Sequence, residues 1–132
     1  MKPITIILNE PPIGKGRPRF TRQGHAYTPA TTRAYEKRLA EAAAKEHFAP
    51  PLTGPLSVKL LAQLPIPKSW PKSKQDAARR GEITPGKPDI DNLIKTLDAL
   101  NGIVWKDDAQ IAHIYARKAY GQPMLVVTVE AA

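Results

Sequence analysis

The chain has 132 residues, the size of one domain with its own core, and its lack of cysteine excludes disulfides, thiolate nucleophiles and cysteine-based zinc sites. A formal net charge of +8 exceeds the needs of a small domain and predicts a polyanionic partner. No apolar run approaches the roughly 18–20 residues of a membrane span, and no signal peptide is recognisable, which favours a cytoplasmic protein that binds nucleic acid and no membrane.

The first third of the chain predicts a strand, a basic arm and a helix. β-Branched residues from Ile4 to Leu8, followed by a proline pair, predict a strand. Residues 14–28 are basic and rich in turn residues, which favours an extended arm or a loose hairpin. An initial proline and an apolar stripe at helical spacing predict a helix from about residue 29 to residue 47.

A strand and an unusual connection follow. Apolar residues alternate in part from Leu56 to Leu64, which predicts a strand. Residues 65–88 contain five prolines and many lysines and arginines, and a short helix is expected near residues 74–80. This connection is longer than most, and loops of such length tend to be functional or mobile.

The last third predicts a helix and two strands. Residues 89–101 have helical spacing, and residues 111–119 and 124–130 are expected to form two antiparallel strands joined by a turn at 121–123. Two main helices packed on a small mixed, mostly antiparallel sheet make an α+β fold. We expect a single domain over residues 1–132, with a Pro/Lys/Arg-rich loop at 65–88.

The helix expected at residues 89–101 has two unlike faces. On a helical wheel Asp91, Lys95 and Asp98 share one face, and three leucines lie opposite them. Asp89 lies at the start, where the helix dipole favours negative charge. The helix therefore presents carboxylate, ammonium and carboxylate in line, and its apolar face suits the sheet.

Acidic residues concentrate around this helix. Five of the chain's 12 acidic residues lie between Asp89 and Asp108, and the last two, Asp107 and Asp108, directly precede a predicted strand. Carboxylates gathered in a basic protein repel one another unless a cation lies among them, and Mg²⁺ and Mn²⁺ take oxygen ligands. Taken singly, each has a structural alternative: Asp89 as a helix cap, Asp91 in a surface ion pair, and the acidic pair as a turn.

Two basic groups are candidates for DNA contact. In an extended arm Lys15, Arg17 and Arg19 point the same way, as a stripe that would follow a phosphate backbone. Phe20 and Tyr27 are candidates for stacking on an unpaired base, with a core position as the alternative. The second group, in the long loop, consists of Lys68, Lys72, Lys74, Arg79 and Arg80. For both groups the alternative is a solvated charged face.

The spacing of these residues resembles that of the RusA family of Holliday-junction resolvases, small endonucleases common in prophages. The resemblance rests on three blocks: Lys-Pro-Asp-x-Asp-Asn-Leu-x-Lys at 87–95, Asp-Ala-Leu-Asn-Gly at 98–102 and Asp-Asp-Ala-Gln-Ile at 107–111. The composite with its fixed spacing is specific, whereas Asp-x-Asp alone would be weak. Residues 65–88 depart from the family in being longer and richer in proline.

The resemblance implies a homodimer that brings one acidic site per subunit to a four-way junction and cuts paired strands with Mg²⁺ or Mn²⁺. It implies that Asp89, Asp91 and Asp108 are catalytic and bind metal, with Asp107 as a weaker metal ligand. It also makes Lys95 catalytic, either by offsetting charge or by orienting water. The expected reaction is phosphodiester hydrolysis in DNA recombination and repair.

Two rival functions stay open at this point. A nuclease that acts on another branched DNA or on RNA would have the same acidic site. A basic nucleic-acid-binding protein without catalysis would have structural acids instead. Comparing a four-way junction, a flap and a linear duplex tests the first rival, and metal-dependent nicking tests the second.

Overall fold

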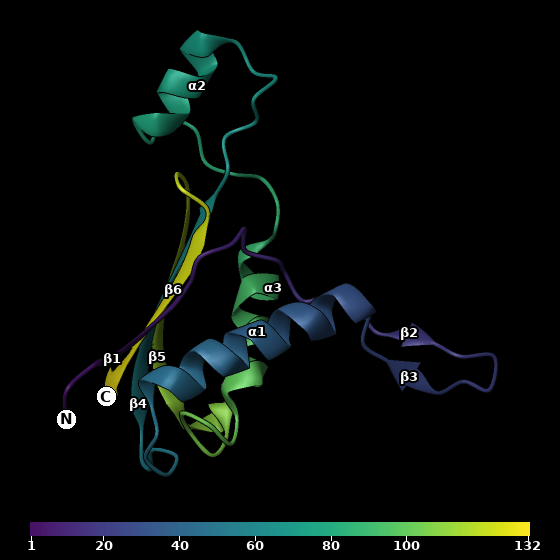
Figure 1. The fold of residues 1–132 in the computed structure, drawn as a ribbon, viewed down its shortest axis with the longest axis vertical. Helices are drawn as coiled ribbons and strands as arrows, with labels where there is room; N and C mark the ends of the chain where they lie inside the picture. Colours follow the sequence, from purple (N-terminus) through teal and green to yellow (C-terminus); the bar gives the residue numbers. More distant parts are fainter.

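The computed structural model describes residues 1–132, which form a mixed α+β fold around a four-stranded sheet of order β1-β6-β4-β5 (Figure 1). These strands are Ile4–Leu8 (β1), Leu56–Leu64 (β4), Ile111–Tyr120 (β5) and Met124–Ala131 (β6). The β1–β6 and β6–β4 pairs are antiparallel, whereas β4 and β5 run parallel. The sheet is therefore mixed and mostly antiparallel, which confirms the fold class expected from the sequence.

Strand β4 lies inside the sheet because one of its faces is almost entirely apolar. Leu56, Val58 and Leu60 point into the core and are at most 1% exposed, whereas Lys59 points outward. The strand pairs with β5 over its whole length and with β6 from Leu56 to Gln63. It therefore holds the sheet together from its centre.

Strands β5 and β6 do not form the hairpin that the sequence predicts. The turn at 121–123 is present, but it crosses the end of β4, which lies between the two strands. The amide of Gly121 donates to the carbonyl of Leu64 at 3.0 Å, and a Cβ on Gly121 would lie 3.2 Å from Oε1 of Gln63. The prediction was wrong because it paired neighbours in sequence, whereas the most deeply buried strand occupies the place between them.

The helices cover one face of this sheet (Figure 1). Helix α1 spans Ala30–Glu46 and packs against β1, and α3 spans Ile90–Lys95 and contacts β5. Two 3-10 helices, η1 (Thr96–Leu100) and η2 (Asp108–Gln110), complete this layer. None of the helices has the length and apolarity that a membrane span requires.

The single helix expected at residues 89–101 is two helices of different pitch. Asp89 is the N-cap of α3, and the winding tightens at Thr96, whose buried hydroxyl donates to the carbonyl of Leu93 at 2.6 Å. A 3-10 helix has three residues per turn, so residues after 95 turn away from their places on an α-helical wheel. The three leucines of α3 and η1 are nevertheless buried, as the wheel predicts.

Two segments project from the body (Figure 1). The short strands Arg19–Phe20 (β2) and Ala26–Tyr27 (β3) form an antiparallel hairpin beyond the start of α1. Beyond the last residue of β4, residues 65–88 contain helix α2 (Lys72–Arg79), close to where a short helix is expected. The rings of Trp70 and Tyr120 meet edge to face at 5.4 Å and attach this segment to β5.

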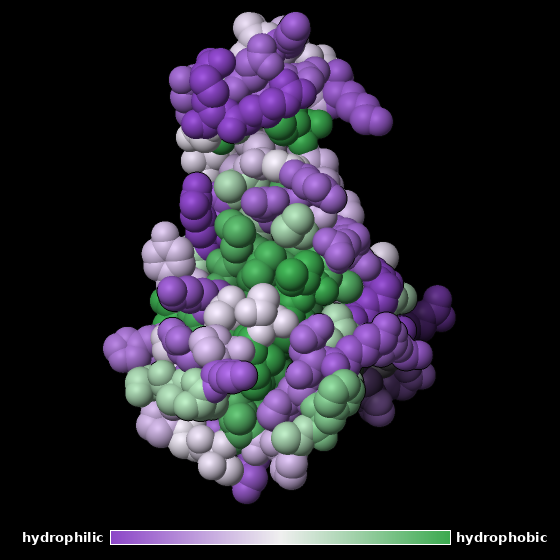
Figure 2. All heavy atoms as spheres, turned by 60° about the vertical axis from the view of Figure 1, so that its left-hand side comes forward, coloured by the Kyte–Doolittle hydropathy of each residue, from purple (hydrophilic) through white to green (hydrophobic).

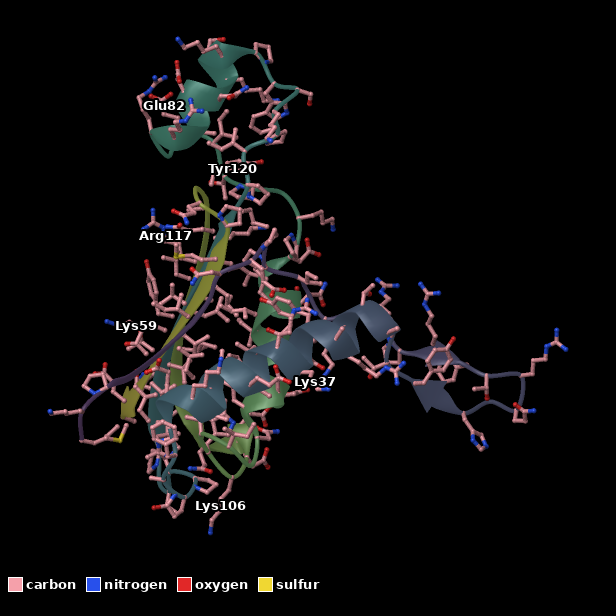
Figure 3. The ribbon with its side chains drawn as sticks, viewed as in Figure 1. Lys37, Lys59, Glu82, Lys106, Arg117 and Tyr120 are labelled. Atoms are coloured by element: carbon pink, nitrogen blue, oxygen red, sulfur yellow. The ribbon has the colours of Figure 1, made fainter.

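The sheet face turned away from the helices is uncovered. Figure 2 shows a hydrophobic band along the body, below the hydrophilic end that contains α2. Leu61 and Val126 are partly exposed on this face, and Tyr115 is 63% exposed. Lys59 and Arg117 extend outward from it (Figure 3) and line a shallow pocket of about 250 Å³ together with those apolar residues.

Candidate active site

Helix α3 presents its acidic and basic side chains to solvent because its leucines are fixed in the core. Leu93 is fully buried, and Asp91 and Lys95 lie on the opposite, exposed side. Nζ of Lys95 lies 3.8 Å from Oδ2 of Asp91, one helical turn away, and both side chains are at least 60% exposed. An exposed pair of this kind is weak, so both groups stay available to a ligand.

Asp89 precedes this helix and is held from two sides. Nζ of Lys87 lies 3.0 Å from its carboxylate, and this hydrogen bond keeps the pKa of Asp89 below its ordinary value. Lys118 of β5 donates to the carbonyls of Gly86 and Pro88 at 2.8 Å and 3.1 Å. The main chain before Asp89 is therefore tied to the sheet.

Asp108 is positioned by the capping box that begins η2. The Asp107 carboxylate accepts from the backbone of Gln110, and the Gln110 side chain accepts from the Asp107 amide at 3.2 Å. The Gln110 amide also donates to the carbonyls of Leu52 and Gly54 at 2.9 Å and 3.1 Å. Asp107 thus has a structural task, and its neighbour Asp108 is left free to face η1.

Asp108 and Asp98 form a carboxyl pair between η2 and η1. The hydrogen bond with Asp98, a second one with Asp107, and burial raise the pKa of Asp108 to about 6. Burial opposes ionisation of Asp98, but hydrogen bonds from Lys15 and Asp108 outweigh it, so the pKa of Asp98 is lowered. The pKa values of these two carboxyl groups are therefore moved apart, and Asp108 is the one that is harder to ionise.

Lys15 contacts the acidic cluster, by which we mean the five aspartates on or beside α3, η1 and η2 (Asp89, Asp91, Asp98, Asp107 and Asp108), although the sequence groups it with the arginines of the arm. Its Nζ lies 3.0 Å from Asp98 and 3.4 Å from Glu36 of α1. Burial lowers the pKa of Lys15, but the bonds to these two carboxylates outweigh that effect and raise it. Its backbone amide donates to the carbonyl of Asn92 at 2.9 Å. Lys15 therefore joins the arm, α1 and α3.

The arm is closely fitted on both sides of Lys15. A Cβ on Gly14 would lie 2.9 Å from Cβ of Pro88, and one on Gly16 would lie 2.9 Å from Oγ1 of Thr32. The Gly16 amide donates to that same hydroxyl at 3.1 Å. Glycine is thus required where the arm passes between the starts of α1 and α3.

A polar pocket of about 280 Å³ lies where the arm meets α3 and η1. Its walls are formed by Lys15, Gly16, Arg17, Pro18, Asn92, Lys95 and Asp98. Three of these side chains are cationic and one is a carboxylate, with no large apolar group among them. Such a lining suits a phosphate beside a carboxylate-bound cation.

The other predicted DNA contacts are divided between the two projections. Arg17 lines the polar pocket, and Arg19 lines a second pocket at the base of the hairpin. On α2, Lys74 lies 4.0 Å over the Trp70 ring. Arg79 is paired with Asp76 and Arg80 with Glu82, whereas Lys72 makes no ion pair.

The candidate donors are carboxylates, which are the ligand type that a hard divalent ion takes, although their side chains are not gathered into a coordination shell. No three acidic or histidine side chains gather closely enough to hold an ion. Of the expected ligands, Asp89 and Asp91 each face a lysine, and Asp108 faces Asp98. Repulsion from Asp98 and Asp107 contributes to the raised pKa of Asp108, a bound cation would relieve that repulsion, and carboxylate oxygens are the ligands that Mg²⁺ prefers.

Three residues of this site are absent from the predicted catalytic set. Asp98 lies on the predicted acidic face of the helix and within the motif, so a sequence signal for it existed. Glu36 and Lys118 reach the site from α1 and β5, 62 residues before Asp98 and 29 residues after Asp89. Nothing in their local sequence distinguishes them from other charged residues, because only the tertiary fold brings them there.

Comparison with known proteins places the whole site inside a matched region. A family model described as endodeoxyribonuclease RusA matches residues 9–130. The chain is also 35% identical over 126 residues to the uncharacterized protein YqaN of Bacillus subtilis (strain 168). That similarity covers 90% of this chain and 89% of the relative. Both similarities extend over nearly the full chain.

Proposed function

The chain belongs to the RusA family of endodeoxyribonucleases, and on this premise we propose that it is a metal-dependent enzyme that resolves Holliday junctions. It would cut four-way DNA by paired phosphodiester hydrolysis during recombination and repair. The observation that carries the proposal is the family match over a chain in which Asp98 and Lys95 line a pocket with the cationic residues Lys15 and Arg17 of the arm.

The proposed ligands of Mg²⁺ or Mn²⁺ are Asp89, Asp91 and Asp108, with Asp107 as a weaker one. Asp98 joins them because it lines the polar pocket beside Lys95 and is a neighbour of Asp108. When bound, a divalent ion supplies an acidified water and offsets negative charge on the phosphate. Ionised carboxylates are needed for this, so Asp108 has to release its proton first.

Lys95 is proposed to contact the scissile phosphate. Its ammonium group is exposed, lines the polar pocket and is only loosely paired with Asp91. In hydrolysis a bond forms between the water oxygen and phosphorus while the bond to the leaving sugar oxygen breaks. Negative charge grows on the phosphate oxygens during this step, and a positioned ammonium group stabilises it.

A homodimer follows from the symmetry of the proposed substrate. A four-way junction is cut at two related positions, and each chain offers one acidic cluster, so two copies related by a two-fold axis supply both. The uncovered sheet face around Leu61, Tyr115 and Val126 is the surface we propose for contact with the second copy. Leu61→Glu should then turn a dimer into a monomer in analytical ultracentrifugation.

The proposal is tested by cleavage of three substrates with the purified full chain. A four-way junction should be cut into paired products with Mg²⁺ and left intact in EDTA, while a flap and a linear duplex are cut poorly. Asp91→Asn should bind the junction and fail to cut it. Asp76→Asn, on α2, is the matched control and should cut normally.

The outcomes separate the proposal from its rivals. Equal cleavage of the flap or of RNA would assign another branched substrate. Binding without metal-dependent cleavage by the wild-type chain would indicate a non-catalytic nucleic-acid-binding protein. Normal cleavage by Asp91→Asn would show that the chemistry lies elsewhere.

A further inference from the structure

The hairpin of β2 and β3 exposes two aromatic rings that its own folding does not use. Phe20 is 68% exposed and Tyr27 is 46% exposed. The register places Phe20 opposite Ala26 and Arg19 opposite Tyr27, so the two rings lie on different faces of the hairpin. An isolated two-stranded hairpin is marginally stable in water, and exposed rings do nothing to stabilise this one.

The charges of the hairpin are all of one sign and are unpaired. No acidic residue occurs between Glu10 and Glu36. Arg17, Arg19 and Arg22 make no ion pair, in contrast to the arginines of α2. The side chains of the hairpin extend into open space (Figure 3). Its surface therefore combines free guanidinium groups with free aromatic rings.

The hairpin begins at the acidic site. Arg17 and Pro18 line the polar pocket together with Lys95 and Asp98. A second shallow pocket of about 220 Å³ follows at the base of the hairpin, between Arg19, Tyr27 and the first residues of α1. A nucleic-acid strand whose phosphate occupies the first pocket would reach the second one next.

We propose that residues 17–27 form a second nucleic-acid site that binds unpaired nucleotides next to the scissile phosphate. Each ring stacks on a base at its own face of the hairpin, Tyr27 at the second pocket and Phe20 on the opposite face, and the arginines contact phosphates. This deepens the proposed function and rests on it for the position of the scissile phosphate. The ligand is an unpaired strand because bases within a duplex are already stacked on each other, whereas every unpaired base offers a free face to a ring. A second copy of the chain would bring the same positive charge and is disfavoured.

The test is fluorescence anisotropy of the full-length chain with a labelled single-stranded oligonucleotide and with a duplex of equal length, both without divalent ions. Phe20→Ala and Tyr27→Ala should each weaken single-strand binding about tenfold and leave duplex binding nearly unchanged. Phe20→Trp should restore it. Phe48→Ala is the matched control, because Phe48 is 89% exposed and lies beyond the other end of α1.

Two results would overturn the inference: equal single-strand affinity of Phe20→Ala and Phe48→Ala, or a change of oligomeric state in Phe20→Ala without DNA. The latter would show that the ring faces a second copy. Junction cleavage by the wild-type chain with Mg²⁺ is measured in parallel. If Phe20→Ala binds the single strand as tightly as the wild-type chain, and the wild-type chain cuts the junction, the hairpin site alone is rejected. A clear Phe20 effect without any cleavage would reject the proposed function and support the hairpin site.

Discussion

The acidic cluster and the basic hairpin adjoin each other in space, yet they are built in opposite ways. In the cluster, Asp98 is bonded by Lys15, Asp89 by Lys87, and the supporting leucines are buried. In the hairpin, the arginines are unpaired and Phe20 is exposed. The difference suggests a division of labour, because chemistry needs side chains held in place, whereas DNA binding needs charges that are not yet neutralised.

Lys15 marks the border between these two regions. It lies only two residues before Arg17, but its charge is already used by Asp98 and Glu36. A change at Lys15 should therefore affect the cluster, and a change at Arg17 should affect binding. The predictions below separate the two regions along this line.

The largest effect is expected from Asp108→Asn. The amide cannot replace a carboxylate ligand, so single-turnover cleavage of a four-way junction should fall at least about 100-fold, while junction affinity stays similar. Gel-based cleavage at saturating protein measures the rate, and anisotropy measures the affinity. A rate within about twofold of wild type would remove Asp108 from the site.

The next largest effect is expected from neutralising Arg19 and Arg22 together by glutamine, with Arg17 left unchanged because it lines the polar pocket beside Lys95. Junction affinity should fall by about 10- to 100-fold, and the slope of log K against log salt should lose up to about 0.9 for each phosphate contact removed. Cleavage of the saturated complex should persist. The comparison is Arg79→Gln with Arg80→Gln on α2, whose charges are paired. An equal loss of junction affinity in the hairpin variant and in the α2 variant would contradict the proposed difference between these two projecting segments.

A smaller, graded effect is expected from pH. The pKa of Asp108 is raised to about 6, mainly by its hydrogen bond with Asp98. Its carboxyl is protonated below that value and cannot serve as an ionised ligand, so cleavage should fall about tenfold per pH unit below about 6. Single-turnover rates from about pH 5 to 8 measure the effect. The chain with substituted hairpin arginines should show the same dependence of cleavage rate on pH. A wild-type rate that does not change with pH would contradict this role of Asp108.

The free energy of unfolding should depend on pH in the opposite direction to the cleavage rate. A raised folded-state pKa means that the protonated carboxyl stabilises the fold at low pH, and that this contribution is lost as the pH rises through about 6. Asparagine imitates the neutral form, so Asp108→Asn should raise Tm at pH 7 and have little effect on it below pH 4. After allowance for solvent screening, the gain is at most about 1 kcal/mol. A lower Tm at pH 7 would contradict it.

The last prediction concerns the link between the two regions and changes the free energy of unfolding, not the chemistry. In Gly16→Ala the new Cβ would meet Oγ1 of Thr32 and Cγ of Pro29, which should destabilise the fold by about 1–3 kcal/mol. Gly86→Ala is the control, since nothing lies within 4 Å of its Cβ position and its φ is not positive. Chemical denaturation measures both. Equal stability of the two variants would show that the arm is not clamped at Gly16.

The sequence predicted those parts of the fold and site that depend on local periodicity. The alternation in Leu56–Leu64 and the leucine stripe of α3 and η1 were sufficient for these elements, and the motif identified Asp91 with Lys95 on the exposed side. The β5–β6 hairpin was wrong because pairing depends on which strand is most buried in the assembled sheet. The ion-pair partners of Lys15 could not be predicted from the sequence because Glu36 lies on another helix.

The most direct test of the central claim compares two proteins on one four-way junction, with affinity and single-turnover cleavage measured side by side. We predict that Asp91→Asn binds like wild type and does not cut with Mg²⁺. The chain with Arg19 and Arg22 replaced by glutamine should bind weakly and cut at the wild-type rate once saturated. Wild-type cleavage by Asp91→Asn would contradict the claim that the acidic cluster performs the chemistry.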